Sequence, residues 1–576
     1  MSTPDRILVI GVDAGTMGLI EGWSDEGRLP GFKHFFQEGV HGKLHSVPNM
    51  CSASAWSSMV TGVNPGKHGI YWFGEYAPDS YEYFYINASY RNGDTLWDIM
   101  SASGRRVGVI NVPISYPADE VNGFLIAGLD APHADDERFT YPPGLLAELR
   151  GQLGEYIIEP GMPGFYKAGR LDEGVRKLHA TIDSRLAYAS HLMKTRPWSF
   201  FMVVFTTVDS AQHFFWKYMK PQGFTLEDDE LRRYQHVIRD VYVHQDDAIR
   251  QLMELAGPDT TVFIVSDHGG DLGGKGPLLP LWLEHMGMLG YVKRARRRGP
   301  HPAMARELIL SLLASGYRSV DRHFERDFKL RLAKTFPGLR QKVEAHMHFS
   351  QIDWAATKAF TDGVRPDIWI NLKGRFPQGI VEPGQEYDDV CEKIRAHFLA
   401  MRDTRTDEGA VDGVIRKEEV YHGPYLDLAP DLVVQWKPDL PATAVALGDT
   451  EATDLQRTRA RLTDRKGGGA GPLGGSGMHG PHGIFFAKGP HIRRGAEMEV
   501  AEIASVAPTL LHLAGLPVPG YMDGRVIEEM FTEEFLSENP VRTTEHTLDS
   551  AGQPEPYSAK EREIIGDRLR GMGYVE

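Results

Sequence analysis

This 576-residue sequence has few cysteines, fewer basic than acidic residues, and few long apolar runs. Its two cysteines, Cys51 and Cys391, cannot build a disulfide framework, which is typical of proteins from a reducing compartment. The formal net charge of −15 argues against a sequence-independent nucleic-acid binder, because such proteins neutralise phosphates with Lys and Arg. The first apolar run, Ile7–Ile10, is too short for a secretion signal or a membrane span. We therefore predict a cytoplasmic protein without a membrane span or a nucleic-acid partner.

The apolar residues that are present follow two alternating patterns. With 41% hydrophobic and 24% charged residues, the composition is that of a globular protein. Helical patterns such as residues 95–104 and 245–255 alternate with short apolar runs such as 106–113 and 260–266. This alternation predicts an α/β fold with a large, mostly parallel sheet flanked by helices.

Three acids stand where predicted buried strands end. Asp13, Asp209 and Asp267 each follow an apolar run, and the carboxyl ends of parallel strands are where open α/β sheets bind ligands. For Asp13 alone, a simple helix N-cap is an equal alternative. Three carboxylates that face one edge of a sheet repel one another unless cations lie between them. The set therefore predicts a site for metal ions.

Histidines accompany these acids. His213 stands four residues after the second acid, on the same face if the loop has become helical, and His268 directly follows the third. His479 lies near the end of residues 467–480, in which eight of fourteen residues are glycine. Such a stretch is either a linker or a mobile lid beside a site. His482 lies close enough to be the alternative ligand to His479.

A serine is the candidate nucleophile. Within residues 47–70, a loop rich in small residues enters a predicted short helix at about Ser52. That position presents a hydroxyl beside free backbone N–H groups, where an anion such as phosphate is favoured. Serine before a helix is more commonly a cap, so the acids and histidines carry the argument.

Taken in order, these motifs resemble the alkaline phosphatase superfamily, in its type I phosphodiesterase and nucleotide pyrophosphatase branch. Within that branch the resemblance is greater to the group known as predicted phosphohydrolase/phosphomutase. The matching pieces are Gly11-Val-Asp13, Ser52-x-x-Ala-Trp56, Thr61-Gly-x-Asn-Pro-Gly-x-His-Gly69, Asp209-x-x-x-His213, Ser266-Asp-His-Gly269, Asn371-Leu-Lys-Gly-Arg375, Gly477-Met-His479 and Ala507-Pro-Thr-Leu510. The resemblance implies an alkaline phosphatase-like fold.

The resemblance also implies the roles of the site residues. It assigns two groups of metal ligands: Asp209, His213 and His479 for one ion, and Asp13, Asp267 and His268, with the Ser52 oxygen, for the other. The implied metal is zinc, although manganese also suits such mixed nitrogen and oxygen donors. Two ions about 4 Å apart stabilise the attacking and leaving oxygens of an in-line displacement, and Ser52 is implied to form a phosphoseryl intermediate.

The sequence departs from the branch at two positions. Ser52 replaces the more common threonine, and Ala55 stands where nucleotide pyrophosphatases carry an asparagine that holds a phosphate oxygen. Ala55 therefore puts specificity for nucleotides in doubt, and another donor must replace the asparagine; lipid head-group, nucleotide and sugar phosphates all stay open as substrates. Asn111 and Arg375 are candidate substrate contacts, with surface or packing roles as the alternative for each.

We predict a metal-dependent phosphoric ester hydrolase, a phosphodiesterase, that acts on a small-molecule phosphate ester. A sulfatase is excluded, because residues 51–55 lack the proline and arginine that formylglycine formation needs. A phosphomutase with the same metal core and a non-catalytic, metal-stabilised binding protein remain as alternatives. The predicted organisation is a first core segment at 1–290, a helical insertion or cap at 291–352, a second core segment with the histidine loop at 353–530, and a peripheral segment at 531–576.

Overall fold

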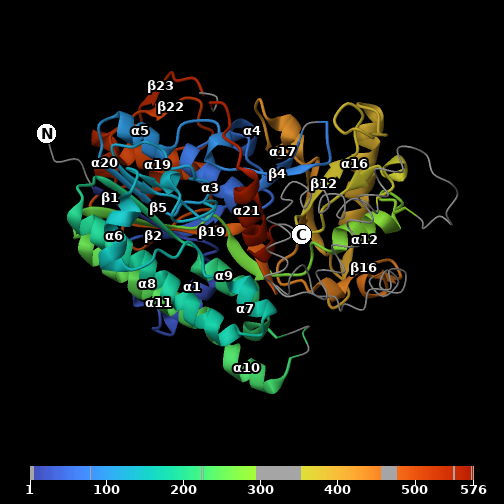
Figure 1. Ribbon diagram of the computed structural model, residues 1–576, viewed down its shortest axis with the longest axis horizontal. Coiled ribbons are helices and arrows are strands. Elements are labelled where there is room, and N and C mark those ends of the chain that lie inside the picture. The colour runs from blue at the N-terminus through green and yellow to red at the C-terminus, as the bar shows by residue number, and fades with distance from the viewer. Residues whose placement is uncertain are drawn as a thin grey trace.

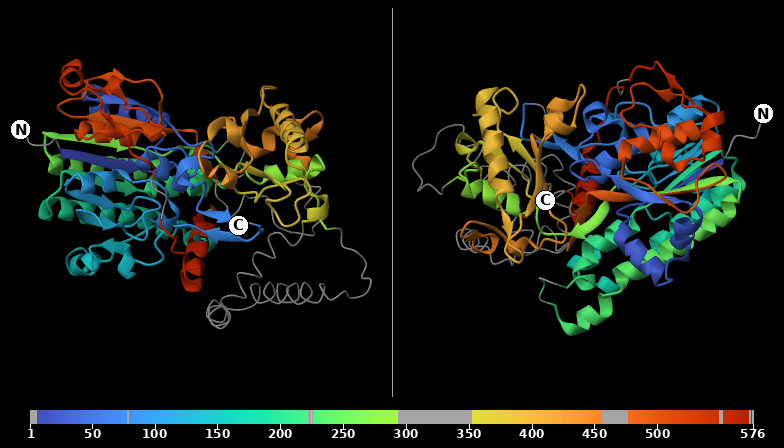
Figure 2. Two further views of the ribbon diagram at one scale, coloured as in Figure 1. Left: turned by 90° about the horizontal axis from the view of Figure 1, so that it is seen from above. Right: turned by 180° about the vertical axis from the view of Figure 1, so that it is seen from behind.

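Among the described residues, a ten-stranded sheet forms the centre of the larger of two lobes in the computed structural model (Figures 1 and 2). The structure describes residues 6–77, 79–221, 224, 226–292, 352–455, 476–548, 552–572 and 574. In order across the sheet the strands are β20 (Ala496–Glu497), β2 (Val40–His45), β19 (His482–Lys488), β9 (Thr260–Val265), β1 (Arg6–Val12), β8 (Phe200–Phe205), β5 (Val107–Ile110), β6 (Gly123–Ile126) and β7 (Thr140–Tyr141), and β21 (Ala501–Glu502) pairs with β2.

The middle of this sheet is parallel, as predicted. Strands β9, β1, β8, β5 and β6 run in one direction, whereas β19 is antiparallel to both of its neighbours. Every residue of β8 and β9 is buried, which is expected of parallel strands covered on both faces. The sheet and its helices confirm the predicted α/β fold with a large, mostly parallel sheet.

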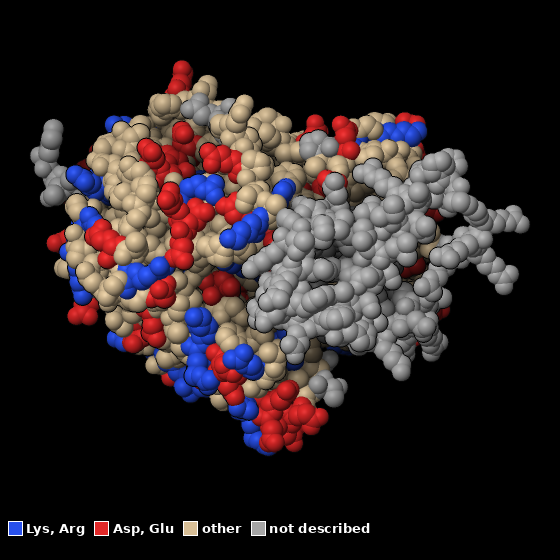
Figure 3. All heavy atoms as spheres, in the orientation of Figure 1, with Lys and Arg blue, Asp and Glu red and all other residues tan. Residues whose placement is uncertain are grey.

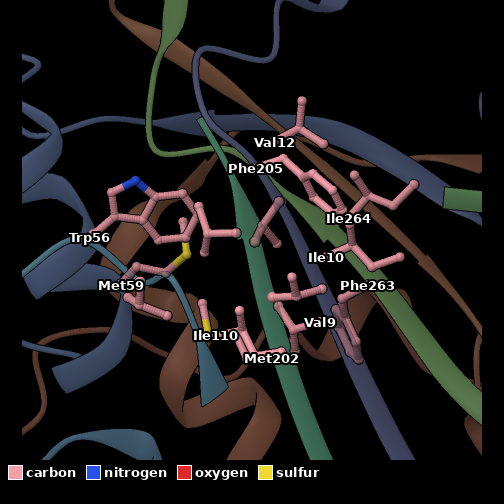
Figure 4. Packing of buried hydrophobic residues seen from close by; sticks show 14 of the residues in the cluster. Val9, Ile10, Val12, Trp56, Met59, Ile110, Met202, Phe205, Phe263 and Ile264 are labelled. Atoms are coloured by element: carbon pink, nitrogen blue, oxygen red, sulfur yellow. The ribbon is translucent and has the colours of Figure 1, made fainter. Parts of the chain in front are cut away.

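Helices cover both faces of the sheet (Figure 1). One side carries α1 (Met17–Asp25), α2 (Pro30–Glu38), α8 (Leu171–Thr195), α9 (Thr207–Met219) and α11 (Val237–Ala256), and the other carries α3 (Ser52–Thr61), α5 (Leu96–Ala102) and α19 (Val506–Leu513). Figure 4 shows Trp56 and Met59 of α3 above side chains of the central strands, such as Ile110 and Met202. This packing fixes the start of α3 over the carboxyl ends of the strands.

The register of the central strands places their ends side by side. Val12 of β1 pairs with Phe205 of β8, and the residue before it, Gly11, pairs with Val265 of β9. Adjacent strands lie about 4.8 Å apart. Asp13, Asp209 and Asp267, which follow these three strands, therefore leave the sheet at the same edge.

The smaller lobe has its own hydrophobic core. Its four-stranded sheet consists of β11 (Ala359–Phe360), β12 (Asp367–Ile370), β15 (Leu432–Trp436) and β14 (Val411–Arg416), and its core includes residues from α12 (Leu278–His285) and α16 (Gln385–Leu399). The segment predicted as the second core segment, 353–530, contributes to both lobes. Residues 353–455 build the smaller lobe, and the chain rejoins the large sheet only at β19.

Two predicted segments lie outside the described residues, namely most of the helical insertion at 291–352 and the glycine-rich stretch up to residue 475. None of the described helices combines the length and apolar character that a bilayer span requires.

On the face drawn in Figure 3, acidic and basic side chains are interspersed over the described surface.

A buried arginine marks the boundary between the lobes. The Arg365 guanidinium lies 4.3 Å from the ring centre of Trp369 and 5.3 Å from that of Trp72, and its Nε donates to Asp362 at 2.6 Å. The nearby Glu75 carboxylate accepts the backbone N–H groups of residues 71 and 72. Burial raises the pKa of Glu75 to about 8, although the Arg365 charge opposes this shift.

From the raised pKa of Glu75 we predict that the free energy of unfolding falls as the pH rises. Its pKa rises from an ordinary 4.5 to about 8 on folding, so its contribution to stability is complete below about pH 4.5 and is lost as pH rises towards 8. Glu75→Gln keeps the acceptor and removes the titration. We expect urea unfolding at pH 5 and pH 8 to differ less in this variant than in the wild type. The exposed Glu82→Gln is the control, and equal pH dependence of Glu75→Gln and wild type would contradict the assignment.

Candidate active site

Six predicted ligands gather at the carboxyl edge of the sheet. They form two groups, within each of which the ligand atoms lie within 4.8 Å of one another: Asp209, His213 and His479, and Asp13, Asp267 and His268. Residues separated by more than 400 positions in the sequence thus meet at one place.

The first group is built on α9. This helix starts directly after β8, so Asp209 and His213 share a face, and the His213 Nε2 lies 3.2 Å from Asp209 Oδ1. His479 comes from β18 (Gly477–Gly480), which pairs antiparallel with β10 (Gly269–Leu272). Its Nε2 lies 3.5 Å from Asp209 Oδ1 and 3.1 Å from His213 Nε2.

The structure thereby separates the two candidate histidines. His482 begins β19 and is exposed, and its ring faces His45 across the strand pair with ring centres 5.6 Å apart. His479, not His482, lies in the first ligand group.

The second group lies over β1 and β9. The His268 Nε2 is 3.2 Å from Asp267 Oδ2 and 3.6 Å from Asp13 Oδ1. The indole N–H of Trp56 donates to the other Asp13 oxygen at 3.3 Å. Asp13 Oδ1 and Asp267 Oδ2 are buried and have no hydrogen-bond partner among the described residues. Buried acceptors without a partner are costly, and a cation would satisfy both.

All three histidines turn the same ring nitrogen to the backbone. Each Nδ1 lies within hydrogen-bond distance of one carbonyl oxygen: Gly477 for His213 at 3.0 Å, Gly269 for His268 at 2.9 Å, and Met50 for His479 at 2.6 Å. A carbonyl only accepts, so each Nδ1 carries a proton and each Nε2 faces the site. Histidines that bind metals are commonly oriented in this way.

The electrostatics of the second group also fit a cation. Burial and the neighbouring Asp267 and Asp209 carboxylates raise the pKa of Asp13 well above its ordinary value. Burial and Asp209 raise the pKa of Asp267 to about 8. Burial and the neighbouring His479 hold the pKa of His268 well below its ordinary value, so its ring is neutral. The donors present, oxygen from acids and nitrogen from histidines, fit zinc or manganese.

Ser52 lies beside the second group. It is the first residue of α3, after Cys51 in an extended conformation, and the helix ends at Gly62 with a left-handed φ of 72°. The Ser52 side chain is buried, and its Oγ lies 3.0 Å from His268 Nε2. The free N–H groups at the start of a helix favour an anion there. The hydroxyl therefore adjoins both the metal-ligand group and a place suited to phosphate.

A small recess beside the first group is lined by Glu159, Met162, Pro163, Asp209, Ser210, His213, Phe214 and Met572. Two ligands of the first group, Asp209 and His213, are among these residues.

The two candidate substrate contacts are placed elsewhere. Asn111 follows β5, and its buried Nδ2 donates to the Val204 carbonyl at 2.9 Å. Arg375 belongs to the smaller lobe, where its guanidinium pairs with Asp431 at 2.8 Å and donates to the Ala429 carbonyl at 2.6 Å. Among the described residues, neither side chain has a hydrogen bond to the two ligand groups.

One residue of the segment 531–576 lies beside Ser52. Helix α21 (Ala559–Met572) leads to Tyr574, which is buried with its hydroxyl 3.1 Å from Ser52 Oγ. Sequence reasoning missed this residue, because a single tyrosine in a charged segment has no pattern that distinguishes it. It also gave Trp56 no role, although this residue belongs to the matching motif around Ser52.

The arrangement of the sheet, the acids and the histidines is the one that the resemblance to the alkaline phosphatase superfamily implies. The family model for type I phosphodiesterase/nucleotide pyrophosphatase matches residues 7–461, so the chain belongs to this family of phosphoester hydrolases. The sequence has no significant match among curated proteins.

Solved structures resemble the chain at low identity. Murine ectonucleotide pyrophosphatase/phosphodiesterase 5 in complex with AMP is 13% identical with a TM-score of 0.47, over 92% of this chain and 100% of that one. Phosphonoacetate hydrolase from Sinorhizobium meliloti 1021 in complex with phosphonoformate is 14% identical with a TM-score of 0.48, over 88% of this chain and 95% of that one.

Proposed function

We propose that this protein is a two-metal phosphodiesterase that hydrolyses a small-molecule phosphate ester through a phosphoseryl intermediate on Ser52. The observation that carries the proposal is the position of the Ser52 Oγ, 3.0 Å from His268 Nε2 and at the start of α3. A hydroxyl among acids and histidines has the surroundings of an activated nucleophile rather than of a helix cap. Its own helix receives no side-chain cap from the preceding Cys51.

The two ligand groups would hold one divalent ion each. Asp209, His213 and His479 would bind the first, and Asp13, Asp267 and His268 the second, beside the Ser52 oxygen. Two bound ions offset the charge of the acids and make an attacking oxygen more acidic. Zinc and manganese both suit these donors.

The chain's own residues account for the first chemical step. The Ser52 oxygen forms a bond to phosphorus while the bond from phosphorus to the leaving alcohol oxygen breaks. The proton that the Ser52 hydroxyl loses balances the proton that the leaving alcohol gains. Water then attacks the phosphoserine, the bond to Ser52 breaks, and the serine regains a proton. The start of α3 provides N–H groups for the phosphoryl oxygens.

The substrate itself is a proposal at the level of its class. Ala55 offers no polar atom to a phosphate, so the proposal does not extend to nucleotides. We place the reaction in the cytoplasm, since the two cysteines are both free and buried.

A panel of phosphate esters tests this function. We expect the protein to hydrolyse bis-p-nitrophenyl phosphate faster than p-nitrophenyl phosphate when loaded with zinc or manganese, and to lose activity on chelation. Acid quenching during turnover, followed by peptide mass spectrometry, is expected to show phosphate on Ser52. A protein that binds two metal ions without turnover would instead be a binding protein. Labelled phosphate found only in an isomerised product would identify a mutase.

A further inference from the structure

Tyr574 contacts the proposed nucleophile from far along the chain. Its hydroxyl lies 3.1 Å from Ser52 Oγ, and its ring centre is 5.7 Å from that of His479 and 6.2 Å from that of His213. Its side chain is 4% exposed, so water has little access to the hydroxyl. The tyrosine is therefore positioned between the serine and the first ligand group.

Several contacts fix this position. The indole N–H of Trp72 donates to the Tyr574 carbonyl at 2.7 Å, and the ring of Phe73 lies 4.5 Å from the tyrosine ring, centre to centre. Upstream, Arg568 donates to the Leu129 carbonyl at 2.6 Å, and the Tyr557 hydroxyl donates to the Asp130 carbonyl at 2.6 Å. The segment is thus held at both ends of α21. The Tyr574 side chain is already fixed, so it loses little rotational freedom when its hydroxyl binds a substrate.

The hydrogen bonds around Ser52 define which group donates. The Ser52 oxygen lies 3.0 Å from His268 Nε2, and it attacks phosphorus only after it has lost its proton, so in the reaction it acts as an acceptor. The Ser52 oxygen then accepts from the phenol of Tyr574. The tyrosine hydrogen is therefore directed at the oxygen on which phosphate would be carried.

We propose that Tyr574 is a catalytic residue whose hydroxyl donates a hydrogen bond to the phosphoryl group as it is transferred to and from Ser52. This inference rests on the proposed function. A phosphoryl oxygen joined through phosphorus to the Ser52 oxygen lies within reach of the same phenol. A hydrogen bond to an anionic oxygen in a site that excludes water is stronger than one between neutral groups. The phenol supplies the donor that Ala55 lacks.

Tyr574→Phe tests the donor, because it removes the hydroxyl and keeps the ring that packs on Phe73. On the zinc-loaded full chain, we expect kcat/KM for bis-p-nitrophenyl phosphate to fall about 10- to 100-fold. Zinc content is expected to stay at the wild-type value. The inhibition constant of vanadate, which mimics the transferred phosphoryl group, is expected to rise by a similar factor.

Tyr557→Phe is the matched control, since it removes another buried phenol of the same segment that bonds to Asp130 and not to Ser52. It is expected to keep kcat/KM within about threefold of the wild type. The inference is overturned if Tyr574→Phe is as active as the wild type or more active, as a residue that merely blocks the site would predict. It is also overturned if Tyr557→Phe loses as much activity as Tyr574→Phe.

Failure of this inference is distinguishable from failure of the proposed function. If the wild-type chain turns over the diester and Ser52→Ala does not, the proposed function holds. If Tyr574→Phe is then fully active, only the inferred role of Tyr574 is wrong. If the wild-type chain hydrolyses no ester, both the proposed function and the role of Tyr574 are wrong.

Discussion

Replacing Ser52 with alanine is expected to lower kcat for bis-p-nitrophenyl phosphate by at least about 10⁴-fold. The substitution removes the oxygen that bonds to phosphorus, and no neighbouring hydroxyl replaces it from the same position on α3. The six acid and histidine ligands remain, so we expect zinc content, measured by mass spectrometry of the metal, to remain about two ions per chain. Phosphate on the peptide that contains residue 52 is expected to disappear.

Ser57→Ala is the matched control for this substitution. Ser57 is buried on the same helix, but its hydroxyl donates to the Ala53 carbonyl within α3. We expect this variant to keep its activity within a few-fold of the wild type, because only an intrahelical hydrogen bond is lost. Comparable activity in Ser52→Ala and the wild type would rule out the phosphoseryl route.

The second large effect is expected from His479→Ala. This histidine lies between the two ligand groups. Its Nε2 is 3.1 Å from His213 Nε2, and its ring stacks on His268 with ring centres 3.7 Å apart. Its loss leaves Asp209 and His213 as the only described ligands of the first group. We expect tightly bound zinc to fall from about two ions to about one, and activity to fall by more than about 100-fold.

His482→Ala provides the control for His479→Ala. The two histidines are three residues apart, but His482 is exposed on β19 and lies against His45. We expect it to retain both metal ions and nearly full activity. If His482→Ala instead released zinc and His479→Ala did not, His482 would be the ligand and His479 would not. The position of β18 in the metal-bound protein would then differ from the one described here.

The parts of the site that sequence reasoning predicted are those with a local pattern. Asp13, Asp209 and Asp267 each end a buried apolar run, and the strands concerned are neighbours in the sheet, so three separate local patterns meet at one edge. The spacing of Asp209 and His213 sufficed because a helix starts immediately after the strand. The large parallel sheet followed from the same alternation of strands and helices.

The parts that sequence reasoning did not predict depend on contacts between distant segments. Tyr574 reaches Ser52 only because Trp72 and Arg568 fix the ends of its segment, and neither contact has a signature in sequence. The smaller lobe was not separated from the core, since its short strands resemble those of the large sheet. The choice between His479 and His482 depended on the pairing of β18 with β10, which spacing does not reveal.

The strand register described above has a consequence for how such a site can diversify. Because β1 lies between β8 and β9, backbone hydrogen bonding between these strands sets where the chain leaves the sheet before each of the three carboxylates. The described strands of the smaller lobe belong to other sheets. Insertion of a single residue between Gly11 and Asp13, by contrast, would turn the carboxylate to the opposite side of the sheet. A change of length within these central strands is therefore expected to disturb the spacing of the carboxylates, whereas a change within the smaller lobe leaves the strand pairing intact.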